Sequence, residues 1–235
     1  MSTLLLTQGD PAALNLLRRA IAARYFISPP ALESLRVDYR GRGHVKLGHM
    51  HSWVPLEAVL FFHFPDSMRW NYTIKPLGVT LRRGSGSFVK GTFYSEQQPA
   101  PVTHSTMLEH LRLSIWAMGA LMLTPLSQPT IYLESRTDHS FIIHNTENDD
   151  QFEVLLYDDY LVRAIRFSSP MLSEETRQPI SICPSREQTV LDGLTVPRRV
   201  EVLRGSTLLY EADVANVAAN PMLSTSFFRA DTASA

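Results

Sequence analysis

The sequence predicts a mainly β protein of the α+β class, in which one strongly curved antiparallel sheet forms an incomplete barrel with an N-terminal helix and a central apolar helix. Several stretches alternate between apolar and polar residues, and short groups of turn-forming residues separate them. One helical stretch, 103–123, is apolar nearly all round. Sheets of many twisted strands curl, and a curled sheet with large apolar side chains encloses a cavity readily.

The composition is that of one folded domain. The chain has 235 residues, of which 44% are hydrophobic and 19% charged. This length suits a single β-rich domain with a substantial core. We therefore expect one domain spanning 1–235, with a helix at 10–27, strands within 35–94, a helix at 103–123, strands within 130–217 and a short tail.

The N-terminal helix has a clear beginning and end in the sequence. Asp10 is a favourable N-cap residue, and Pro11 suits the first helical position. Apolar residues then recur at helical spacing. The helix is expected to end before Ser28-Pro29-Pro30, because the two prolines cannot continue it.

A long strand is predicted next, from Leu35 to Leu47. Apolar residues and glycines occupy one face of this stretch, and charged or polar residues occupy the other. Gly41 and Gly43 lie on the apolar face, where a missing side chain permits a sharp bend or a close approach of another backbone.

Further strands are expected near 58–64, 68–74, 77–82 and 88–94. Pro65-Asp66-Ser67 and Lys75-Pro76 are predicted turns between them. Gly84-Ser85-Gly86-Ser87 is also interpreted as a hairpin turn, since it has neither the lysine of a phosphate-binding loop nor a following helix.

The helix Thr103–Leu123 is the most apolar segment of the chain. A helix that crosses a membrane needs about 20 consecutive apolar residues. Glu109, His110 and Arg112 interrupt the best candidate, Met107–Leu126, so no membrane span is predicted. We expect a helix that is buried on more than one side or that covers a groove.

The second half of the chain is predicted to be a series of hairpins. Turn residues mark its hairpins, and Pro170–Glu187 is the less regular part. Strands are expected near Thr130–Leu133, Ser140–Asn145, Phe152–Tyr157, Leu161–Ser168, Val196–Leu203 and Leu208–Val217.

Large apolar side chains are the candidate ligand-binding residues. A β domain of this size needs such residues for its core alone, so two interpretations stay open, a filled core and a lined pocket. The broad apolar surface of 103–123 favours a pocket. The seven candidates are Phe62, Trp70, Tyr72, Phe93, Leu113, Trp116 and Phe141.

Charge and cysteine content argue against several classes of function. The net charge is −1 and the arginines are scattered, which does not suit a nucleic-acid-binding protein. Cys183 is the only cysteine, so the chain forms no internal disulfide, and we interpret it as a core thiol. His49 and His51 share a strand face, but two ligands make a poor metal site; neither a metal nor another cofactor is predicted.

The best catalytic candidate is the neighbouring pair Asp138 and His139. A carboxylate next to a histidine can orient a general base. The pair lies in a sequence typical of a β-turn, and no activated nucleophile is identifiable. We therefore predict no catalytic residues.

The C-terminal third resembles the LolA-like and LolB-like lipoprotein-carrier superfamily. The resemblance lies in the hairpin pattern of Val190–Val202, in the strand that follows, and in the ending Asn220-Pro221 with Ser226-Phe227-Phe228. The hairpin at Asp158–Ile165 and the order of elements agree with it. This resemblance implies an incomplete β-barrel that is covered by helices and holds acyl chains on its concave face.

The leading hypothesis is a non-enzymatic protein that binds a lipid-like or other apolar small molecule. A structural or assembly subunit, whose apolar helix packs on a partner or membrane protein, is the alternative. An enzyme using Asp138 and His139 is the third possibility. The first ten residues have no basic region and only a short apolar run, so we expect a cytoplasmic protein, or a periplasmic one if a leader has been removed.

Overall fold

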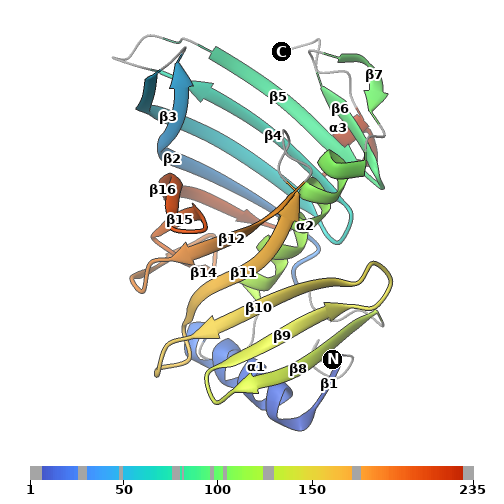
Figure 1. Cartoon of the computed structure of the whole chain (residues 1–235), viewed down its shortest axis with the longest axis vertical. Coiled ribbons are helices and arrows are strands. Elements are labelled where there is room, and N and C mark those ends of the chain that lie inside the picture. Colours follow the sequence, from blue (N-terminus) through green and yellow to red (C-terminus); the bar gives the residue numbers. More distant parts are fainter. Residues whose placement is uncertain are drawn as a thin grey trace.

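A large, curved and open antiparallel sheet dominates the molecule, with one long helix on its concave side (Figure 1). The computed structural model describes residues 7–25, 31–47, 50–75, 80, 82–95, 98–102, 105–123, 130–170 and 176–229. In Figure 1, β2–β7 form the upper part of the molecule and β8–β11 the lower part, and α2 runs diagonally between them.

The described residues form three helices and sixteen strands. The helices are α1 (Pro11–Tyr25), α2 (Ser105–Met122) and α3 (Thr225–Arg229). The strands of the first half are β1 (Gln8–Gly9), β2 (Ser34–Leu47), β3 (Met50–His63), β4 (Ser67–Ile74), β5 (Arg82–Val89), β6 (Thr92–Ser95) and β7 (Gln98–Val102). Those of the second half are β8 (Ile131–Thr137), β9 (Ser140–Asn145), β10 (Asp150–Leu156), β11 (Val162–Pro170), β12 (Arg177–Pro184), β13 (Gln188–Leu191), β14 (Leu194–Pro197), β15 (Arg199–Arg204) and β16 (Thr207–Ala219).

Fourteen of these strands form one continuous sheet. Their order is β1-β8-β9-β10-β11-β12-β15-β16-β2-β3-β4-β5-β6-β7. Neighbouring strands are antiparallel except β1 and β8, which are parallel. The sheet begins with β1 and ends with β7, so in the described part of the chain it is not closed. β13 and β14 form a separate hairpin.

The N-terminal helix begins as the sequence predicts. The Asp10 carboxylate accepts a hydrogen bond from the backbone N–H of Ala13 at 2.7 Å, which caps α1. Residues 26–30, including the two prolines, lie outside the described residues. At its other end α1 contacts α2: the buried Arg24 donates to the carbonyl of Leu121, and the Tyr25 hydroxyl donates to that of Met122 at 2.9 Å. These bonds satisfy carbonyls that the end of α2 leaves free.

The long alternating strand is confirmed as β2. Leu35 and Val37 are buried, whereas Arg36 and Asp38 lie on the opposite face and form an ion pair at 2.8 Å. Gly41 allows the close approach that the sequence suggested: a Cβ there would lie only 2.0 Å from the carbonyl oxygen of Glu211 in the neighbouring strand β16.

The interpretation of Gly84–Ser87 as a hairpin turn is wrong, because these residues lie inside β5. Gly84 and Gly86 pair with Tyr72 and Trp70 of β4. A Cβ on Gly86 would lie 2.5 Å from the Trp70 ring, and one on Gly84 2.7 Å from the Tyr72 ring. The two glycines therefore leave room for aromatic rings to lie across the strand, and this arrangement compensates for their low strand preference.

Other strand boundaries also differ from those expected. The stretch 88–94 is a hairpin rather than one strand: it turns at Lys90 and Gly91, both of which have positive φ. Much of the segment expected to be less regular forms β12, which pairs with β11 and β15 over most of its length. Most of the strand expected at 77–82 lies outside the described residues, as does the tail after 229.

The C-terminal elements include a tight turn, a side chain that bonds to the start of β2, and a buried aromatic residue. Asp192 and Gly193 form the turn between β13 and β14, and both have positive φ. The Asn220 side chain accepts hydrogen bonds from the backbone of Glu33 and Ser34 at 2.8 and 3.1 Å, which attaches the end of β16 to the start of β2. Phe228 of α3 is buried.

Candidate functional site

An apolar cavity of about 190 Å³ lies between α2 and the concave face of the sheet. Met118 and Leu121 of α2 form its helical side. The sheet side comes from β2, β3, β12, β15 and β16, and consists of Tyr39, Leu56, Ala58, Leu60, Ile182, Val200, Val202, Tyr210 and Ala212. No charged side chain is among these eleven lining residues.

Small residues leave this space open. Ala58 of β3 and Ala212 of β16 line the cavity, and Gly43 of β2 lies beside it. A Cβ on Gly43 would meet nothing closer than Leu56 and Tyr210, at 3.8 and 3.9 Å. Three neighbouring strands thus present small side chains on their inward face opposite α2. Since well-packed interiors leave few such voids, this one needs its small residues.

Two tyrosine hydroxyls are the only polar side-chain groups among the lining residues. Partial removal from water raises the pKa of Tyr210 to about 12, and burial raises the pKa of Tyr39, which the nearby Tyr210 raises further. Both phenols are therefore protonated and uncharged over the whole physiological pH range. They supply hydrogen-bonding groups to an otherwise apolar surface.

Beyond the cavity, towards α1, the interior is nearly filled. A void of only about 10 Å³ continues from it and shares Tyr39, Met118, Leu121 and Val200. Leu35 and Met122, which border this void, are 0% and 3% exposed. The usable space is therefore the part near Ala58 and Tyr210.

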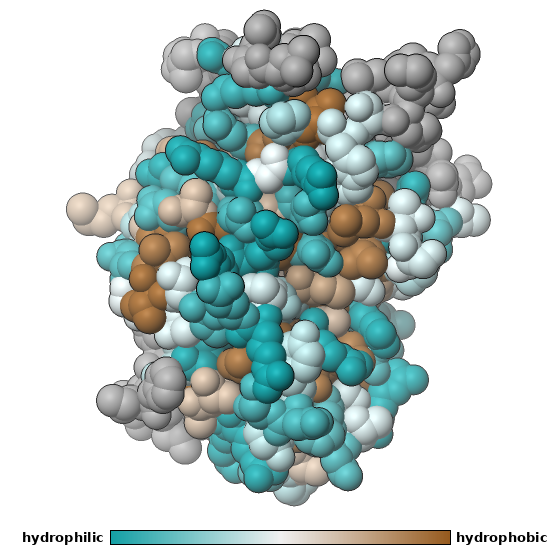
Figure 2. Space-filling model, turned by 90° about the vertical axis from the view of Figure 1, so that its left-hand side faces the viewer, coloured by the Kyte–Doolittle hydropathy of each residue, from teal (hydrophilic) through white to brown (hydrophobic). Residues whose placement is uncertain are grey.

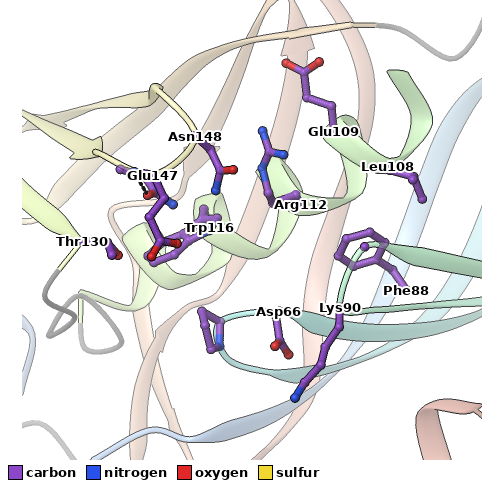
Figure 3. Close-up of a pocket in the computed structure, with 13 residues that line it drawn as sticks. Asp66, Phe88, Lys90, Leu108, Glu109, Arg112, Trp116, Thr130, Glu147 and Asn148 are labelled. Carbon is purple, nitrogen blue, oxygen red and sulfur yellow. Dashed lines mark hydrogen bonds between the residues drawn. The ribbon is translucent and has the colours of Figure 1, made fainter. Parts of the chain in front are cut away.

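A larger and more polar cleft of about 600 Å³ lies on another side of α2. Leu108, Arg112 and Trp116 of α2 point towards it (Figure 3). Asp66 and Lys90, from the turns that end β3 and β5, lie on one side of the cleft, and Glu147 and Asn148, from the turn between β9 and β10, lie on the other.

Several charges of this cleft are already paired. Arg112 forms a two-bonded ion pair with the buried carboxylate of Asp150, at 2.8 and 2.9 Å. Glu109 pairs with Arg177. An apolar ligand would have to displace water from the remaining charged groups, at a cost in free energy, so this cleft is the poorer site for such a ligand.

The structure does not gather the seven predicted binding residues around one cavity. Phe62, Phe93, Leu113 and Phe141 are buried and line none of the cavities described above. Trp116 lines the polar cleft. Trp70 and Tyr72 pair with Leu60 and Ala58 across the sheet, so they lie on the concave face one strand beyond the apolar cavity. Contact of any of the seven with a ligand stays a prediction.

None of the eleven residues that line the apolar cavity is among the seven predicted binding residues. A cavity exists where inward positions are small, and the inward residues Gly43, Ala58 and Ala212 carry that signal. Taken one at a time, none of these residues indicates a cavity. Only the pairing of β16 with β2 and of β2 with β3 places them side by side.

The alternative hypotheses gain little from the geometry. His139 lies in the turn after β8, with its Nε2 4.0 Å from the exposed carboxylate of Asp158, and neither His139 nor Asp138 lines a cavity described above. In α2, Trp116, Met118 and Met122 are 6%, 8% and 3% exposed, so the helix offers none of them to a partner. On the face shown in Figure 2, apolar residues form separate groups among hydrophilic ones.

Within the described residues, no three His, Cys, Asp or Glu side chains come together as a metal site. Burial raises the pKa of the half-buried Cys183 thiol. Among the helices that the structure describes, none has the length and hydropathy needed to cross a bilayer.

Comparison with solved structures identifies the fold. A LolA superfamily protein from Nitrosomonas europaea superposes with a TM-score of 0.53 at 12% identity, covering 92% of this chain and 96% of that one. Two others superpose less closely: a Vibrio parahaemolyticus domain assigned to outer membrane lipoprotein sorting (TM-score 0.48, 10% identity, 92% and 95% covered) and a DUF1329 family protein from Desulfovibrio piger (0.44, 9%, 93% and 98%). No protein-family model matches the sequence, and no curated protein matches it significantly. The chain has a LolA-like fold, as its C-terminal residues suggested.

Proposed function

We propose that this chain is a single-domain, non-enzymatic binding protein that holds a lipid-like or other apolar ligand on the concave face of an incomplete barrel. The observation that carries the proposal is the apolar cavity between α2 and the sheet, which no charged side chain lines. The LolA-like fold supports the same role, because the resemblance of the C-terminal third to the lipoprotein-carrier superfamily implies that acyl chains bind on this face.

The size of the cavity limits what fits. Pockets for drug-sized ligands usually measure about 300–1,000 Å³, and this one measures about 190 Å³. It therefore accommodates a short apolar chain or the end of a longer one. Each buried methylene contributes about 0.8 kcal/mol, so a chain end of a few carbons supplies several kcal/mol without any catalytic group.

Binding rather than catalysis suits the lining chemistry. General acid–base catalysis requires a titratable group near the reacting atoms whose pKa lies near the working pH. The cavity lining contains no carboxylate, histidine, lysine or cysteine, and the pKa of both tyrosines is raised away from neutrality. The expected cytoplasmic location has no support in the structure, and the proposed binding does not depend on it.

The test is binding of a neutral fluorescent probe, N-phenyl-1-naphthylamine, to the delipidated protein. The wild type is expected to enhance and saturate the probe's fluorescence. Ala58→Leu places a larger side chain in the cavity and is expected to weaken binding about tenfold or more, because the probe and the new side chain compete for one small space.

The matched control is Ala215→Leu, the same change at an exposed position of β16 that does not line the apolar cavity. It should leave probe affinity unchanged. Equal weakening by both substitutions, or no saturable binding by a folded wild type, would contradict the proposal. Native mass spectrometry of the undelipidated protein then identifies the mass of any ligand carried through purification.

A further inference from the structure

The two tyrosines of the apolar cavity have unused hydrogen-bonding capacity. Within the described part of the chain, neither the Tyr39 hydroxyl nor the Tyr210 hydroxyl makes a hydrogen bond to another protein group. Elsewhere in the described residues the Tyr25 hydroxyl donates to a carbonyl and the Ser169 hydroxyl contacts His110, whereas the buried hydroxyls of Ser85 and Ser87 have no partner. Tyr39 and Tyr210 differ from these two serines because they line the apolar cavity, so their hydroxyls are available to a ligand inside it.

The two hydroxyls belong to side chains that line the same cavity. Tyr39 of β2 and Tyr210 of β16 both line the cavity, and their side chains are near enough for a charge on one to disfavour a charge on the other. Tyr210 retains 42% of its accessible surface although it lines this recess, so water reaches it in the empty protein. Water therefore satisfies the Tyr210 hydroxyl when no ligand is present.

We propose that Tyr39 and Tyr210 select an apolar ligand that carries one uncharged hydrogen-bond acceptor, such as an ester or amide carbonyl, within its chain. This inference rests on the proposed function, since it names the chemical class of ligand for the same cavity. A pure hydrocarbon displaces the water and leaves both hydroxyls unpaired, which costs binding free energy. A ligand carbonyl replaces that water and accepts the hydrogen bonds.

The uncharged lining of the cavity explains why the preferred acceptor is uncharged. Among the residues that the structure describes, no lysine, arginine or histidine lines the cavity, so no cation would compensate a carboxylate brought there from water. The phenols have raised pKa values and stay protonated, so they donate hydrogen bonds but cannot bind a cation as phenolates. An ester is therefore preferred over the carboxylate of equal chain length.

The experiment compares three competitors that displace N-phenyl-1-naphthylamine at pH 8: methyl heptanoate, heptanoate and nonane. The wild type is expected to bind the ester about tenfold more tightly than either of the others. Tyr39→Phe and Tyr210→Phe are each expected to lower the preference for the ester over nonane, and the double variant to bring it within about twofold. Tyr132→Phe, an exposed tyrosine of β8 that lines no cavity described here, should change nothing.

The outcomes separate this inference from the function on which it rests. If the wild type binds the probe but prefers nonane or heptanoate, or if the double variant keeps the full preference for the ester, the inference is overturned and binding of apolar ligands stands. If a folded wild type does not bind the probe, the proposed function itself fails. Retained probe affinity in the double variant shows that it folds, because phenylalanine preserves the apolar ring.

Discussion

The two sides of α2 differ in chemistry although one helix provides a wall for both. Met118 and Leu121 face a small cavity without charges, whereas Leu108, Arg112 and Trp116, spaced four residues apart, face a cleft about three times larger with several charges. Side chains three or four residues apart lie on the same face of a helix. Leu108, Arg112 and Trp116 therefore share one face of α2, and Met118 and Leu121 share another.

The larger opening is the poorer candidate for binding an apolar ligand. In the cleft, Arg112 is already held by the buried Asp150, and Glu109 by Arg177. In the cavity, two tyrosine hydroxyls make no hydrogen bond to any other group in the described part of the chain, and the remaining lining is apolar. The charges on the first side therefore hold α2 in place, and the second side is the one that we propose binds the ligand. The predictions below separate these two roles.

The largest expected effect is loss of stability on breaking the charged side. Arg112→Ala leaves the carboxylate of Asp150, which is 3% exposed, without its cation. Removing one partner of a buried ion pair costs about 3–5 kcal/mol; since Arg112 is partly exposed, we expect about 3 kcal/mol in urea unfolding. Probe affinity in the folded fraction should not change.

Arg136→Ala provides the control for that variant. Arg136 approaches Glu153 at 3.7 Å at the surface of the sheet, and its side chain is 60% exposed. Exposed pairs of this kind contribute less than about 1 kcal/mol. If Arg112→Ala were no more destabilising than this control and instead altered ligand binding, the cleft would have to be regarded as a binding site.

The next effect concerns the apolar side. Leu121→Ala enlarges the cavity and is expected to cost about 2–3 kcal/mol of stability, near the lower end for buried leucines because Leu121 already borders an empty space. The same variant should bind longer chains more tightly, which displacement by methyl esters of increasing length measures. Leu113→Ala, at a buried position of α2 that lines neither opening, should lose comparable stability without this gain.

The smallest effect is a pH dependence from His110, between α2 and β11. Burial lowers the pKa of His110 below its ordinary 6.5, and its Nδ1 lies 2.8 Å from the Ser169 hydroxyl. The unfolded chain therefore takes up this proton first, and stability falls as the pH drops through 6.5 towards the lowered value. His110→Gln should show a smaller loss of stability between pH 8 and pH 5.5. An unchanged pH profile of unfolding in this variant would contradict the assignment.

Much of the fold follows from local patterns. The N-cap at Asp10, the alternation along Leu35–Leu47 and the apolar surface of α2 each predict the element that forms, because local hydrogen bonding or burial of one face determines it. The glycines of β5 could not be predicted in this way. Their sequence predicts a turn, and only the structure shows that Trp70 and Tyr72 of the neighbouring strand lie across them.

An apolar cavity beside the long helix was predicted, but the residues that line it were not. Large aromatic side chains were expected to surround a ligand, and several of them instead fill the core, such as Phe62 and Phe141. A cavity results from the sum of volumes that several strands contribute, so the identity of any one side chain reveals little about it. Ala58 and Ala212 acquire their meaning only from sheet pairing.

The sequence by itself determined that α2 is a buried apolar helix, that β2 has one solvent-exposed and one buried face, and that the chain resembles proteins of LolA-like fold. Each of these properties depends on residues that are close along the chain. Only the tertiary structure decided which side of α2 faces an uncharged cavity and which side faces a charged cleft. That outcome depends on the register of strands far apart in sequence, which brings Tyr39, Ala58 and Tyr210 to one place opposite the helix.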